Sequence, residues 1–155
     1  MKPIHLAYIA AAGSAALLAG AFIFQYLGYP PCKMCIWQRY PHALAAAFGL
    51  AFLALKNRLI LWLGMLAAFS TSAVGMYHVG VEKQWWEGPA SCSSAGISGL
   101  SVDELLDKIL AAPVVRCDEV AWEFIGISMA GWNAILSLAL AALWLIAALA
   151  NRRVS

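Results

Sequence analysis

Long apolar runs constrain the fold of this chain more than any other feature of its sequence. A helix needs about 20 residues, at roughly 1.5 Å each, to cross the ~30 Å hydrocarbon core of a bilayer. Residues 4–27, 59–79 and 124–150 reach that length, and only a few Ser, Thr, His and amide side chains interrupt them. The sequence therefore predicts an all-α integral membrane protein in which these three runs span the bilayer.

A fourth run is shorter and has a polar start. Residues 43–55 are entirely apolar, but a full span requires a helix over residues 36–55. That helix includes polar residues in its first two turns, among them Arg39 and His42. We predict a bundle of four transmembrane helices that forms a single domain over residues 1–155.

The composition agrees with a membrane protein. Of the 155 residues, 63% are hydrophobic and 12% are charged, whereas soluble domains have roughly 45–50% and about 25%. A soluble domain of this size cannot bury so much apolar surface. The composition excludes a disordered chain and argues against a soluble enzyme, and a net charge of +2 is too small for a nucleic-acid-binding surface.

The charged residues predict the orientation. All eight acidic residues lie in residues 80–123. Five basic residues lie at the two ends of the chain and in the turn 56–58: Lys2, Lys56, Arg58, Arg152 and Arg153. By the positive-inside rule both termini and this turn are cytoplasmic, so loops 28–35 and 80–123 are on the outer side. The first run exceeds the 7–15 apolar residues of a signal peptide, so we expect an uncleaved span.

All four cysteines, Cys32, Cys35, Cys92 and Cys117, lie in the two outer loops. Cysteines confined to one face of a membrane indicate an oxidising compartment there, which is the periplasm for a bacterial inner-membrane protein. One interpretation is that they form structural disulfides that hold the loops on the bundle. For Cys92 and Cys117 this interpretation is as good as a redox role.

The Cys32-Lys33-Met34-Cys35 motif favours redox chemistry. A disulfide that closes so short a loop stabilises a fold little, because loop-closure stabilisation grows with loop length. Since the second membrane helix is expected to follow directly, Cys35 lies at a helix N-terminus, which favours the thiolate. A zinc site is the competing interpretation, but it calls for a second closely spaced cysteine pair, which the chain lacks. We therefore expect no metal.

Arg39 and His42 follow Cys35 by four and seven residues, which places the three on one face of a helix. A guanidinium at this depth can stabilise a thiolate or donate to the carbonyl oxygen of a bound electron acceptor. The alternative is an arginine that extends to the membrane surface. Pro41 disturbs helix geometry, so the alignment of His42 is less secure than that of Arg39.

Over essentially its whole length the chain resembles the DsbB family of disulfide bond formation proteins. The first matching feature is a CxxC motif in a short outer loop, followed four residues later by Arg39. The second is a long outer loop that bears Cys92 and Cys117. The motifs that carry the resemblance are CKMCIWQR at 32–39, YHVGVE at 77–82, WWEGP at 85–89, and Cys117 followed by Trp122 and Phe124.

The resemblance implies a sequence of thiol–disulfide exchanges. A DsbA-like periplasmic protein of thioredoxin fold attacks a Cys92–Cys117 disulfide and forms a mixed disulfide at Cys92. Electrons pass to the Cys32–Cys35 pair, and from Cys35 to a membrane quinone, ubiquinone or menaquinone, bound near Arg39. A quinone suits this role because DsbA, at about −120 mV, is itself a strong oxidant and requires a stronger one.

The resemblance also makes His78, near the outer end of the third span, a candidate quinone contact beside His42. The alternative is that His78 is an interfacial histidine paired with Glu82 or with water. Several aromatic residues lie near the expected outer membrane surface, as in an interfacial belt: Trp37, Tyr77, Trp85, Trp86 and Trp122.

The second outer loop contains a predicted amphipathic helix. Ser101 and Glu104 form a capping-box start, and apolar residues recur after it at helical spacing until Pro113. We expect this helix to lie in the plane of the membrane interface, rather than on a soluble lobe. Residues 91–99, rich in Ser and Gly, are expected to be flexible.

Two other functions compete with a DsbB-like oxidase. Vitamin K epoxide reductase type proteins also have four spans and a CxxC motif, but their motif follows the loop cysteine pair, whereas here it precedes Cys92 and Cys117. The other alternative is a non-catalytic protein of four spans whose disulfides only brace its loops.

Overall fold

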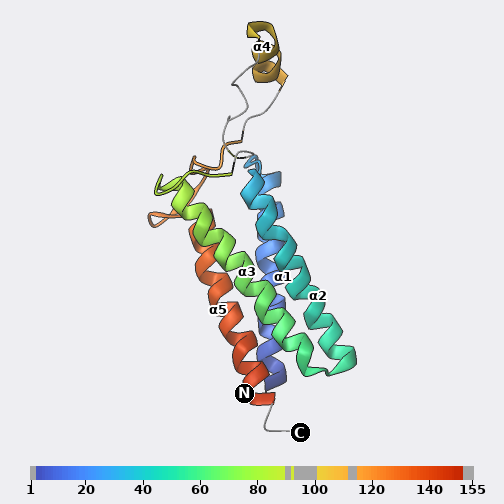
Figure 1. Cartoon of the computed structure of the whole chain (residues 1–155). Helices are drawn as coiled ribbons and strands as arrows, with labels where there is room; N and C mark the ends of the chain where they lie inside the picture. The colour runs from blue at the N-terminus through green and yellow to red at the C-terminus, as the bar shows by residue number, and fades with distance from the viewer. Residues whose placement is uncertain (1–2, 90–91, 93–100, 112–114, 152–155) are drawn as a thin grey trace.

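A computed structural model describes residues 3–89, 92, 101–111 and 115–151. Its long helices are α1 (Pro3–Tyr26), α2 (Lys33–Leu55), α3 (Arg58–Glu82) and α5 (Met129–Ala150). Figure 1 shows these helices side by side, with both chain ends at one end of the bundle and the longer connections at the other. Three of them, α1, α3 and α5, are long and apolar enough to cross a membrane, which confirms a helical membrane protein.

Helix α2 has 23 residues, about as many as the others, but polar residues occupy its first turns. It begins at Lys33, three residues earlier than the expected start at Ile36, because Cys32 caps it. The Cys32 Sγ accepts a hydrogen bond from the Cys35 backbone N–H, as an N-cap side chain does. Cys35 therefore belongs to the first helical turn rather than to the preceding loop.

The last long helix also differs from the prediction. It begins at Met129 instead of residue 124, because residues before it form a small antiparallel hairpin of β1 (Glu123–Phe124) and β2 (Ile127–Ser128). Gly126, at φ +73°, makes the turn. The Ser128 side chain then caps α5 by accepting from the Gly131 N–H. Apart from this hairpin of two-residue strands, the described residues form the helices expected of an all-α protein.

Small residues let the helices approach closely, as is usual in membrane bundles. Helix α3 packs against α2 and α5, and α1 packs against the same two helices. Much of the core consists of alanines around the fully buried Trp144. At Gly64 an added Cβ would lie 2.7 Å from the Trp144 ring, so this contact requires glycine. Large apolar side chains such as Leu50 and Leu66 are exposed on the outside, as expected for a lipid-facing surface.

The amphipathic helix is present as α4 (Val102–Ala111). Figure 1 shows it beyond the end of the bundle where the longer connections meet. Its position in a membrane interface stays a prediction. Pro113 lies outside the described residues, as do residues 91–99 apart from Cys92.

Candidate active site

The structure brings all four cysteines together at the loop end of the bundle. Cys92 and Cys117 are joined by a disulfide, and both pack in one buried cluster with Cys32. Cys117 is completely buried, and Cys32 and Cys92 are 4% and 5% exposed. Cys35 is half-buried at the edge of the cluster. Cys32 and Cys92, which are 60 positions apart in the chain, therefore lie in one cluster.

The start of α2 makes the two thiols of the CxxC motif unequal. The Cys32 and Cys35 sulfurs are 2.9 Å apart, with Cys32 as the donor. That hydrogen bond lowers the pKa of Cys35, which lies at the outer end of α2, ahead of the segment expected in the membrane. The same hydrogen bond, together with burial, raises the pKa of Cys32 well above its usual range. The Cys35 thiol of the reduced pair therefore loses its proton more easily than the Cys32 thiol.

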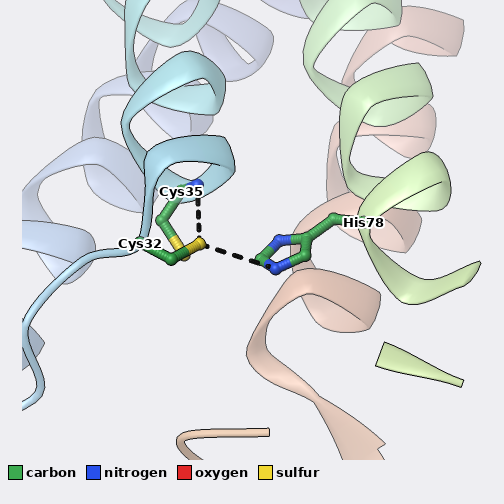
Figure 2. A group of neighbouring side chains, drawn as sticks. All are labelled: Cys32, Cys35 and His78. Carbon is green, nitrogen blue, oxygen red and sulfur yellow. Dashed lines mark hydrogen bonds between the residues drawn. The ribbon is translucent and has the colours of Figure 1, made fainter. Parts of the chain in front are cut away.

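His78 on α3 lies against the cysteine cluster (Figure 2). Its Nε2 is 3.1 Å from the Cys117 carbonyl oxygen and 3.6 Å from the Cys32 Sγ. The same nitrogen is 4.0 Å from a Glu82 carboxylate oxygen, so the predicted neighbour is also present. Ser128 donates to the other oxygen of Glu82. His78 is the one side chain that contacts both cysteine pairs among the described hydrogen bonds.

A buried polar network links α2, α3 and α5 below the cysteines. Gln38 Nε2 lies 3.2 Å from His78 Nδ1. Asn133 Nδ2 donates to Gln38 Oε1 at 2.6 Å and to Thr71 Oγ1 at 3.3 Å. Asn133 Oδ1 in turn lies 2.8 Å from His42 Nε2. Sequence reasoning treated Asn133 as a minor interruption of an apolar run, although an amide within a span is itself a sign of a polar contact between helices.

Arg39 turns toward α1. Its Nη1 donates to Gln25 Oε1 at 2.6 Å, and its Nη2 donates to the Ala21 carbonyl at 3.1 Å. The guanidinium also lies over the Phe22 ring, 4.7 Å from its centre. These contacts hold the guanidinium against α1. Gln25 gave no usable signal in the sequence, because its partner comes from another helix.

A cavity of about 450 Å³ opens beside the cysteines between α1, α2 and α5. Its wall is mostly apolar and includes Phe24 and Trp122, whose rings meet edge to face at 5.0 Å. Trp122 is thus a wall of this cavity as well as a member of the expected aromatic belt. The polar and sulfur-bearing residues at the cavity include Cys32, Cys35, Gln38, Arg39, His42, His78, Glu82 and Asn133.

Two polar atoms of cavity-lining residues are buried without a partner in the described part of the chain. They are Arg39 Nε and His42 Nδ1. Buried polar groups normally have hydrogen-bond partners, and an exception indicates a ligand or a functional role. The Arg39 Nε–H is a donor. Because His42 Nε2 faces an acceptor oxygen of Asn133, its Nδ1 is free to accept. The cavity therefore suits an apolar ring that carries oxygen substituents.

Comparisons with a family model and with curated proteins point to the same family. Residues 4–147 match the family described as "Disulfide bond formation protein DsbB". Several relatives carry the name Disulfide bond formation protein B. That of Polaromonas naphthalenivorans is 33% identical over 97% of this chain and 95% of its own length. That of Polaromonas sp. strain JS666 is 29% identical over 96% of this chain and 92% of its own length. An uncharacterized protein of Rickettsia prowazekii is 29% identical over 79% of this chain and 74% of its own length. No solved structure gives a significant match.

We predict that Cys35 of the reduced protein is alkylated at lower pH than Cys32. The Cys32 hydrogen bond holds the pKa of Cys35 down, so its reactive thiolate persists as the pH falls. In Cys32→Ala this donor is lost, and the pH profile of Cys35 alkylation should move to higher pH. At a pH below the Cys35 pKa, each unit by which that pKa rises lowers the thiolate fraction roughly tenfold.

The measurement is iodoacetamide labelling over a pH series, read by peptide mass spectrometry. Cys32→Ser is the matched control, because its hydroxyl still donates and the profile should move less. Identical profiles in wild type, Cys32→Ala and Cys32→Ser would contradict the assignment.

Proposed function

Because the chain belongs to the DsbB family of disulfide bond formation proteins, we propose that it reoxidises a DsbA-like periplasmic protein and passes the electrons to a membrane quinone. The observation that carries this proposal is the position of the cysteines. Both pairs pack in one cluster, and Cys35 lines an apolar cavity beside it. This arrangement joins a thiol-exchange site to a site for a lipid-soluble acceptor.

We place the protein in a bacterial inner membrane with four spans, α2 being the fourth. Both termini lie on the cytoplasmic side, and the cysteines lie on the periplasmic side. In support, the two chain ends and the α2–α3 turn lie at one end of the bundle in Figure 1. That end carries Lys56 and Arg58, as the positive-inside rule requires of a cytoplasmic turn.

The first exchange consumes the Cys92–Cys117 disulfide. A thiolate of the partner attacks Cys92 and releases Cys117; the partner's second thiol then resolves the mixed disulfide. Two electrons and two protons have passed to Cys92 and Cys117, and the partner leaves as a disulfide. Because Cys92 is 5% exposed in the present arrangement, the 80–123 segment has to move for this attack.

The second exchange transfers the same two electrons to an oxidised Cys32–Cys35 pair. The reduced loop pair attacks the Cys32–Cys35 disulfide, a new bond forms between Cys92 and Cys117, and Cys32 and Cys35 become thiols. The packing of Cys32 against Cys92 and Cys117 supports this step, because exchange requires direct sulfur contact.

The last step occurs at the cavity. A bound quinone supplies an acceptor for two electrons and two protons. Arg39 Nε is positioned to donate a hydrogen bond to a carbonyl oxygen, and His42 Nδ1 is positioned to accept one from a hydroxyl. Phe24 and Trp122 cover the apolar part of the ligand and exclude water. Cys35, held at the same cavity, and Cys32 supply the two electrons and two protons, and the Cys32–Cys35 disulfide forms again.

A purely structural role for the cysteines leaves these features unexplained. Bracing disulfides do not require Cys35 to line an apolar cavity or Arg39 Nε to be buried without a partner. The vitamin K epoxide reductase alternative conflicts with the position of the CxxC motif ahead of the loop pair.

The direct test is turnover by the purified protein in detergent. With a reduced DsbA-type protein and a short-chain ubiquinone or menaquinone analogue, we expect loss of quinone absorbance and oxidation of the partner. Cys35→Ser removes the electron donor and should abolish turnover. Ser70→Ala, on an exposed position of α3, should turn over normally. Failure of the wild-type protein with both quinones and several DsbA-type partners would sink the proposal.

The order of the cysteines has its own test. In Cys117→Ser, Cys92 is first oxidised by an activated disulfide, and a reduced partner variant that keeps its attacking thiol but lacks its second, resolving thiol is then added. Neither Cys117 nor the partner can resolve the mixed disulfide, so this partner should remain trapped. We expect a mixed disulfide at Cys92, identified by non-reducing electrophoresis and peptide mapping. Trapping at Cys32 instead would refute the assigned order.

For Arg39→His we expect the apparent quinone KM to rise about tenfold or more, because a hydrogen bond to a charged group contributes about 1.5–3 kcal/mol. Gln25→Leu is the matched variant, since it removes the partner of Nη1 but keeps the guanidinium, and its effect should be smaller. Steady-state kinetics with varied quinone provides the measurement. An unchanged KM in Arg39→His would exclude Arg39 from the quinone site.

A further inference from the structure

Three side chains at the end of the bundle form a set of metal-ligating atoms. The sulfurs of Cys32 and Cys35 and a ring nitrogen of His78 all lie within 4.8 Å of one another. Figure 2 shows the two cysteines at the start of α2 and the His78 imidazole extending from α3 toward them. We propose that the reduced protein binds one thiophilic divalent cation, such as Zn²⁺, at Cys32, Cys35 and His78, and that the bound ion blocks the thiol pair.

The distances suit zinc. Zn–S and Zn–N bonds are about 2.3 and 2.0–2.1 Å, so at a tetrahedral angle a sulfur and a nitrogen on one ion lie about 3.6 Å apart. The Cys32 Sγ and the His78 Nε2 are 3.6 Å apart already. Two sulfurs on one ion lie about 3.8 Å apart, so the Cys32–Cys35 pair has to open from 2.9 Å. Cys35 borders the cavity and has space to rotate its sulfur outward.

Glu82 lies outside this set of three, and in this proposal its carboxylate moves in as the fourth ligand. Its carboxylate oxygen lies 4.0 Å from His78 Nε2, and its other oxygen is held by the Ser128 hydroxyl. His78 and Glu82 are one helical turn apart on α3, so the backbone keeps them on the same face. Two thiolates and a carboxylate also bring enough negative charge to offset a divalent ion in buried surroundings.

The imidazole binds through Nε2 only if its proton is on Nδ1. A ligating histidine normally donates that proton to an acceptor. Gln38 lies 3.2 Å from Nδ1, and turning over its side-chain amide presents an oxygen there. The Asn133 amide then turns as well, so that its oxygen accepts from Gln38 and its bond to Thr71 is lost. Its nitrogen donates to His42 Nε2, whose proton moves to Nδ1. The network below His78 therefore provides the required acceptor. This change breaks the hydrogen bond from Gln38 Nε2 to the Met34 carbonyl oxygen.

Binding is a ligand exchange without electron transfer. The two thiols lose two protons, two sulfur–metal bonds form, and no residue changes oxidation state. A Cys32–Cys35 disulfide has no thiolate to offer, so the oxidised protein does not form this site. The inhibition of turnover rests on the function proposed above, whereas the binding itself does not.

Cobalt(II) is the probe, because tetrahedral thiolate coordination gives it intense visible absorption. Wild-type protein and a Cys92→Ala/Cys117→Ala variant, in which only the CxxC thiols remain, are reduced anaerobically, freed of reductant and titrated in detergent. We expect one equivalent to bind, zinc to displace it, and protein oxidised at Cys32–Cys35 to give no such spectrum.

The variants test the third ligand. Since loss of even an outer-shell partner weakens metal binding about 10–100-fold, His78→Ala should weaken it by about 100-fold or more. His5→Ala, which removes an exposed histidine outside this network, should retain the wild-type affinity. Equal affinities in wild type and His78→Ala, or equal binding by oxidised and reduced protein, would overturn the proposal.

The comparison of metal binding by oxidised and reduced protein uses the wild-type chain. It therefore tests the proposal even if His78→Ala folds poorly. Zinc should also stop quinone reduction by wild-type protein, and a chelator should restore it. Binding without turnover in any condition would contradict the proposed function and leave the metal site standing. Turnover without metal binding would contradict the metal site and leave the proposed function standing.

Discussion

The structure depends on one constraint: polar side chains at the start of α2 lie inside an apolar bundle and require partners there. Each of them bonds to a different helix. Gln38 contacts His78 of α3, Arg39 contacts Gln25 of α1, and His42 contacts Asn133 of α5. Since an unpaired polar group is costly in apolar surroundings, these bonds favour one arrangement of the four long helices over others with equally good apolar packing.

The same bonds orient the redox centre. They hold the first turns of α2 rigidly, and the CxxC motif begins that helix. Cys32 is directed into the cluster with the loop disulfide, and Cys35 is directed to the cavity. Although Arg39 and His42 form these hydrogen bonds between helices, Arg39 Nε and His42 Nδ1 remain without partners in the described part of the chain. The groups that fix the bundle thus also leave one donor and one acceptor for a ligand.

Much of this could be predicted from the sequence, because it depends on local pattern. Run length predicts the helices, and the spacing of Cys35 and Arg39 predicts that they share a face. What could not be predicted depends on contacts between helices: nothing near Gln25 or Asn133 in the sequence points to Arg39 or His42. The hairpin before α5 was missed for another reason, because Phe124 and Ile127 are apolar and read as part of the following span.

The contact between His78 and Cys117 connects the two cysteine pairs physically. In the present arrangement His78 Nε2 lies 3.1 Å from the Cys117 carbonyl oxygen, and the loop disulfide is buried, which suits exchange between the pairs. Attack by a partner protein needs the opposite arrangement, with Cys92 exposed, and therefore the loss of this contact. A metal ion on Nε2 would take the nitrogen that Cys117 uses, so it would free the loop pair while it blocks Cys32 and Cys35. Under these two proposals, one imidazole nitrogen serves either the contact with Cys117 or a metal ion, but not both.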